Sequence, residues 1–171
     1  MTKFLLSLHV LAAIIAVGPV TVAASMFPPS ARKALAEPDS ERAVSAVRLL
    51  HRICRVYGGV GIAVPVLGFA TALSMGVLKD AWLIVSMLLT ALAAMVLLAL
   101  VLPRQEEILE GLGGTAVGTG TGAAAGTGTV TVTDAGTAAT ARLAMFTGVF
   151  NLLWATVTIL MIVRPGSTTG A

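Results

Sequence analysis

One histidine and three methionines are the residues of this chain best suited to chemistry in apolar surroundings: His9, Met75, Met87 and Met161. An ionisable side chain within an apolar run is costly, so His9 is a functional candidate. Imidazole and thioether ligands together suit Cu(I), and a His/Met pair also holds haem iron. We therefore predict His9 as a haem or copper ligand, with the three methionines as candidate metal ligands. The competing interpretation is structural: a neutral His9 bonded across helices, and methionines that fill gaps in an apolar core.

Other kinds of active site lack the residues to build them. The chain has one cysteine, Cys54, and two histidines, which excludes an internal disulfide framework and a closed zinc site. His9 and His51 cannot hold one haem iron together, because the first span separates them by about 20 Å. No Ser/His/Asp arrangement, intramembrane carboxylate pair or phosphate loop can be assembled, so we predict no catalytic residues. Whether the chain is an enzyme stays open, with a non-enzyme favoured.

The elements that position these residues are predicted to be membrane-spanning helices. The chain of 171 residues is 57% hydrophobic and only 11% charged, with a mean hydropathy of +0.96, whereas soluble domains are about 25% charged. Four stretches without charged residues each hold the roughly 20 apolar residues that a helix needs to cross the bilayer. We therefore predict an all-α, four-transmembrane-helix bundle that forms one membrane domain over residues 1–171. Its predicted spans are about 4–26, 56–78, 81–103 and 143–163.

Prolines and short connections set the predicted helix ends. Pro28 and Pro29 predict that the first helix stops near Met26, because proline lacks a backbone donor and disfavours helical geometry before it. A loop from Phe27 to Asp39 follows. The second and third spans are separated only by Lys79 and Asp80, which predicts an antiparallel hairpin of neighbouring helices.

The distribution of basic residues predicts the orientation. Most lysines and arginines lie in the first-to-second and third-to-fourth connections. The positive-inside bias therefore places both termini outside the cytoplasm of a multi-pass cell-membrane protein. The lipid bilayer is the predicted partner. Nucleic acid is not, because the basic residues flank apolar runs and do not line a face with interleaved aromatic residues.

A cleaved signal peptide over residues 1–24 is a rival interpretation of the N-terminus. Lys3 supplies a basic start, and Val22, Ala23 and Ala24 form a passable cleavage site. The apolar run is longer than the usual core of about 7 to 15 residues, and it contains His9. We therefore expect this segment to remain as the first span.

The cytoplasmic connections divide into a charged part and an uncharged part. Arg48, Arg52 and Arg55 share one stripe of a helix expected to begin after Ser40. Pairing with Glu106, Glu107 and Glu110 beyond the third span is one expectation, and a basic patch for anionic lipid is the other. Residues 111–141 are almost entirely Gly, Ala, Thr and Val, which predicts a flexible cytoplasmic linker.

Small residues mark one face of the second span. Gly58, Gly61, Pro65, Gly68 and Ala72 recur at intervals of three and four residues, a spacing that lets a neighbouring backbone approach closely. Pro65 removes one helical hydrogen bond, so the carbonyl of Gly61 is predicted to be free for a side chain, water or ligand. In the last span Asn151 is expected to bond another helix.

Two stretches carry a family resemblance: Phe4 to Pro19, with the run FLLSLHVLAA, and Phe146 to Gly166, with the run FTGVFNLLW. They resemble the bacterial predicted integral membrane proteins grouped as domain of unknown function 2269, which implies four spans and no particular activity. More distantly, a histidine early in the first span followed by small residues is similar to the copper-resistance D membrane proteins and the haem-dependent membrane protoporphyrinogen oxidases. That resemblance implies a haem or copper role for His9 alone. The first span has no Trp, and no second histidine lies at matching depth.

These observations lead to one functional hypothesis and two alternatives. The leading hypothesis is a small membrane protein whose bundle interior binds a metal, haem or small solute near the outer surface through His9. The alternatives are a small transporter or channel subunit and a structural assembly partner. A homo-oligomer or another membrane partner also stays open.

Overall fold

Helices make up nearly all of the computed structural model, which describes residues 1–117 and 128–166, with side chains described for 1–113 and 136–166. No strand occurs in these described residues. The elements in chain order are α1 (Thr2–Ala36), α2 (Glu41–Val60), α3 (Ala63–Met75), α4 (Ala81–Met95), the π-helical segment η1 (Val96–Val101), α5 (Leu102–Val117) and α6 (Gly128–Val163).

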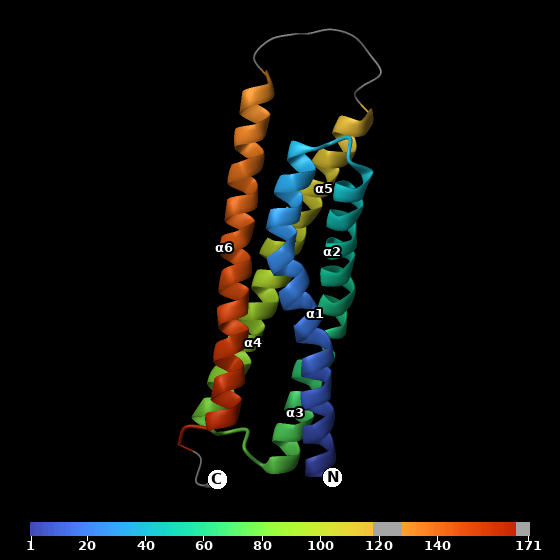
Figure 1. Ribbon diagram of the computed structural model, residues 1–171. Coiled ribbons are helices and arrows are strands. Elements are labelled where there is room, and N and C mark those ends of the chain that lie inside the picture. The colour runs from blue at the N-terminus through green and yellow to red at the C-terminus, as the bar shows by residue number, and fades with distance from the viewer. Residues whose placement is uncertain (118–127, 167–171) are drawn as a thin grey trace.

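These elements form four long helical rods, drawn side by side in Figure 1. The first is α1, the second joins α2 to α3, the third joins α4, η1 and α5, and the fourth is α6. Each is long and apolar enough to cross a membrane. The predicted all-α, four-transmembrane-helix bundle is confirmed, and the chain is a multi-pass helical membrane protein.

The first helix continues through its prolines. The prediction that it stops near Met26 was wrong, because α1 runs to Ala36 and contains both Pro28 and Pro29. Phe27 and Ala31 on this segment are completely buried in the core. Burial of a large side chain contributes about 1.5 to 3 kcal/mol, which offsets much of the cost of the missing hydrogen bonds. The loop between the first two helices therefore comprises four residues, Glu37 to Ser40, instead of the predicted Phe27 to Asp39.

Ser40 then caps α2, and its hydroxyl accepts a hydrogen bond from the Ala43 amide at 3.4 Å. A helix was expected to begin after Ser40, and serine is suited to this position because its hydroxyl satisfies a free N–H group of the first helical turn. The turn sends α2 back along α1, and the two helices pack against each other. At 35 residues, α1 is about 50 Å long, so it extends beyond the roughly 30 Å of hydrocarbon in a bilayer.

The predicted linker over 111–141 is largely helical. The prediction was wrong for 111–117, which belong to α5, and for 128–141, which belong to α6; residues 118–127 lie outside the described residues. The small side chains permit packing: a Cβ on Gly136 would lie 3.2 Å from Leu35 Cδ1 of α1. Thr140 and Leu112 are buried as well. The extension of α1 past its prolines therefore gives the start of α6 a surface to pack on.

The end of the bundle that holds the α3–α4 turn is divided into two helix pairs. There α3 packs on α1, and α4 packs on α6, and Figure 1 shows these pairs apart on either side of the molecule. The α3–α4 connection is antiparallel and short, as predicted, and its Gly76 adopts the left-handed conformation that ends α3. Direct packing between the two helices is confined to a cluster of Ala72, Trp82 and Leu83 beside the turn. Farther from the turn the second and third spans meet again, where a Cβ on Gly58 would lie 3.4 Å from Leu97 Cδ2, so they are neighbours in the bundle, as predicted.

Candidate functional site

The second rod is interrupted at a glycine-rich segment. α2 ends at Val60 and α3 begins at Ala63, where glycines weaken the helix and Pro65 lacks an N–H donor. The Gly61 carbonyl accepts a hydrogen bond from the Val64 amide at 3.1 Å. The prediction that this carbonyl is free was therefore wrong, because the chain tightens locally and supplies the next available donor. A Cβ at residue 61 would lie 3.0 Å from the Gly58 carbonyl oxygen, so glycine suits this geometry.

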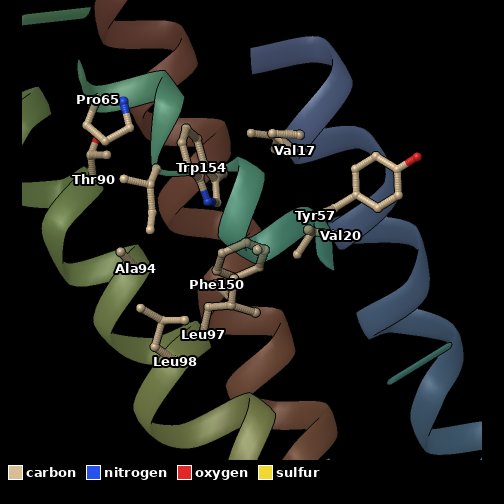
Figure 2. A pocket seen from close by; sticks show the side chains of 14 residues that line it. Val17, Val20, Tyr57, Pro65, Thr90, Ala94, Leu97, Leu98, Phe150 and Trp154 are labelled. Atoms are coloured by element: carbon tan, nitrogen blue, oxygen red, sulfur yellow. The ribbon is translucent and has the colours of Figure 1, made fainter. Parts of the chain in front are cut away.

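A cavity of about 110 Å³ lies beside this interruption. All four rods contribute to its wall, as Figure 2 shows from close by. The lining residues are Ala16, Val17, Val20, Tyr57, Gly58, Gly61, Ile62, Pro65, Thr90, Ala94, Leu97, Leu98, Phe150 and Trp154. Phe150 and Trp154 meet edge to face, with ring centroids 6.4 Å apart, a favourable arrangement for aromatic rings.

The cavity wall is apolar in its chemistry. The hydroxyl of Thr90 donates to the Ser86 carbonyl at 2.8 Å, so it is already paired. Figure 2 shows the Tyr57 hydroxyl directed away from the other lining side chains. An apolar cavity of this kind stays dry and accepts apolar guests; an engineered cavity of about 150 Å³ binds benzene or xenon. The site is thus suited to binding and holds no group placed for acid, base or nucleophilic catalysis.

His9 lies on α1 toward the end that holds the α3–α4 turn, outside the cavity lining. It is buried, as predicted, and its Nδ1 lies 3.0 Å from the Val64 carbonyl oxygen of α3. A carbonyl only accepts, so Nδ1 carries the proton and donates it, and the lone pair of a neutral ring is on Nε2. Gly68 packs directly on the ring, since a Cβ there would lie 2.9 Å from His9 Cε1. The small-residue face of the second span thus makes room for the imidazole.

The three methionines are distributed over three helices. Met87 on α4 is 44% exposed, and Met75 and Met161 are half-buried. Met75 is seven residues beyond Gly68, about 10 Å along the helix axis. Within the described residues, no group of three or more His, Cys, Asp or Glu side chains could hold a metal ion. The assignment of His9 and the methionines as metal ligands stays a prediction.

Sequence reasoning missed a buried polar contact at the end of the bundle opposite the α3–α4 turn. Gln105 of α5 is fully buried; its Oε1 lies 3.1 Å from His51 Nδ1, and its Nε2 lies 3.6 Å from Cys54 Sγ. These contacts join α2 to α5. The only available signal was a glutamine beside charged residues, and nothing in that context indicates burial. By contrast, Asn151 bonds another helix as predicted, through Nδ2 to Ser25 Oγ at 3.0 Å.

Comparison with known proteins finds no matching family model, no matching curated protein and no matching solved structure. The resemblance to the four-span membrane family, and the more distant one to copper-resistance D proteins, stay predictions.

Replacing Gly68 with alanine tests whether the imidazole depends on this glycine. We expect Gly68→Ala to lower stability by about 1 to 3 kcal/mol, because the added methyl overlaps the buried ring. The midpoint of thermal unfolding in detergent, followed by circular dichroism, measures this loss. Gly18→Ala is the matched control, since nothing lies within 4 Å of a Cβ there. The cost should vanish in a His9→Ala background, and an equal cost in both backgrounds would contradict the contact.

Proposed function

We propose that this protein binds a small apolar molecule within its helical bundle, in the cavity beside the α2–α3 interruption. The observation that supports the proposal is the cavity itself: about 110 Å³, with a wall drawn from all four rods. Its apolar lining matches a guest that dissolves in the bilayer. The proposal places the ligand deeper in the bundle than His9.

The exposure of the lining residues supports entry from the side of the bundle. Ile62 and Leu98 both line the cavity, and they are 62% and 51% exposed. In a membrane-spanning segment an exposed apolar side chain faces lipid. A lipophilic molecule therefore reaches the cavity from the hydrocarbon without crossing water.

The size of the cavity favours a small ligand over haem. Pockets for drug-sized molecules occupy about 300 to 1,000 Å³, several times the volume found beside the α2–α3 interruption. A haem in this position would require the helices to separate. The apolar lining also supports a lipophilic guest over an ion, and the transporter, channel and assembly alternatives stay untested.

Photolabelling tests the cavity proposal. A short alkyl diazirine, activated in nanodiscs, is expected to label Ala16, Val20 and Phe150, which are at most 3% exposed and lie on the cavity wall. Mass spectrometry of the digested protein locates the label. Ala94→Phe should fill the cavity and abolish this labelling.

Ala91→Phe on the same helix is the matched control, because Ala91, like Ala94, is exposed but does not line the cavity. It should leave labelling of the buried wall unchanged, and exposed Leu88 should be labelled in every variant. Absence of label from the buried wall of the unmodified protein would contradict the proposal.

A second candidate is binding of copper or haem through His9. The specific support is the hydrogen bond from Nδ1 to the Val64 carbonyl, because a metal-binding histidine commonly donates its other ring nitrogen to such an oxygen. His9 Nε2 would be the ligand atom. Its partner ligands are not assigned.

Metal content tests this candidate. Protein loaded with Cu(I), and protein purified without added metal, would be measured for copper by elemental mass spectrometry and for haem by optical spectrum. If His9 is a ligand, bound metal disappears in His9→Ala and persists in Met95→Leu, since Met95 is 60% exposed and is not a candidate ligand. Unmodified protein without copper or haem would rule out this role.

We further propose that both termini lie outside the cytoplasm of the cell membrane, as the basic residues favour. Exposed Lys79 and Glu37 lie at opposite ends of the bundle. A membrane-impermeant maleimide should label Lys79→Cys in intact cells and label Glu37→Cys only after lysis. Native Cys54 is fully buried and gives the unlabelled baseline. The reverse pattern would invert the topology.

A further inference from the structure

Three arginines of α2 form one exposed stripe. Arg48, Arg52 and Arg55 are spaced by four and three residues, so their side chains fall within about 60° around the helix. All three are exposed. The buried residues Ala43 and Cys54 lie on the other side of α2 and belong to the core. We call Arg48, Arg52 and Arg55 the arginine stripe.

Among the residues whose side chains the structure describes, no acidic group pairs with the arginine stripe. In the part of the chain whose side chains are described, the one ion pair joins Arg104 and Glu107 of α5, at 2.8 Å. The expected pairing between the basic and acidic stripes is therefore not formed. The reason is geometric, since α5 meets α2 through its buried face, where Gln105 contacts Cys54. Three positive charges are left facing the surroundings of the protein.

Exposed apolar residues run beside the arginine stripe on the same helix. Leu49, Val56 and Val60 are 58%, 53% and 44% exposed. By helical geometry they lie on the flank of the arginine stripe, away from the core. This surface therefore presents cationic groups and, next to them, side chains suited to a hydrocarbon chain.

Counted from Met75, helix geometry places the arginine stripe at the depth of lipid headgroups. Hydrocarbon about 30 Å thick corresponds to roughly 20 helical residues, and that length counted back from Met75 ends near Val56. The headgroup region adds about 5 to 7 Å, or roughly four residues. Arg55 and Arg52 fall in that region, and Arg48 is one turn further out. Long arginine side chains reach along a helix to place their charge at the interface.

We propose that the arginine stripe, together with Leu49, Val56 and Val60, binds an anionic phospholipid. The guanidinium groups would donate paired hydrogen bonds to phosphate oxygens, and an acyl chain would lie along the apolar flank. In the orientation proposed above, this lipid belongs to the cytoplasmic leaflet, whose surface is negative. The inference is independent of the cavity and of His9.

Lipid competition measured by native mass spectrometry tests the proposal. Purified full-length protein in mild detergent would receive equal amounts of phosphatidylglycerol and phosphatidylcholine with identical acyl chains. We expect the unmodified protein to retain phosphatidylglycerol preferentially. The triple variant Arg48→Gln, Arg52→Gln, Arg55→Gln should lose roughly tenfold or more of this preference. Higher salt should weaken the preference in the unmodified protein.

The matched control removes the same charge elsewhere on the same end of the bundle. The variant Arg32→Gln, Lys33→Gln, Arg42→Gln changes three exposed basic residues outside the arginine stripe, and it should keep the preference for phosphatidylglycerol. Circular dichroism and size-exclusion chromatography establish that both variants are folded.

Two results would overturn the proposal. One is an equal loss of preference in both variants, which would indicate a general charge effect. The other is the absence of any preference in the unmodified protein, as expected if the arginine stripe serves an acidic protein segment instead.

Discussion

Close approach of three helices to α1 is the constraint on which the rest of the structure depends. Lipid tails are as apolar as the side chains they meet, so helices in a membrane associate through packing and not through exclusion of water. α1 satisfies this need with small buried residues, among them Ala16, Ala24, Ala31 and Ala34, each at most 1% exposed. α2, α3 and α6 all pack on this helix. The second and fourth rods are placed by α1, and the cavity is the space that this packing leaves.

The number and type of the spans could be predicted because charged residues are costly in hydrocarbon. Each span is therefore visible in the sequence as a long stretch without them. The helix ends could not, because local rules competed with packing. Pro28 indicates a helix end by its own chemistry, yet burial of the neighbouring Phe27 holds the helix together. Gly136 reads as a flexible residue, but its small size is what permits contact with Leu35.

The candidate sites differ in how far sequence alone determines them. Burial of His9 follows from the cost of exposing an ionisable side chain to lipid. The cavity does not follow from any spacing, because a void depends on how side chains from four helices fit together. The contact between Gln105 and Cys54 is equally hidden, since a polar residue at a membrane boundary is ordinarily solvated. The expected pairing of the α2 arginines with the α5 glutamates does not form, because α5 contacts α2 through the face that carries Gln105.

The interruption between α2 and α3 divides the second rod into two helical segments that meet at a joint. Above the joint, Gln105 ties α2 to α5; below it, His9 ties α3 to α1. Gly58, Gly61 and Pro65, which line the cavity, also lie at the joint. The facing wall comes from α4, η1 and α6, so a change in angle at this interruption would change the separation of the two walls. The volume offered to a guest would then change as the two helix pairs move apart or together.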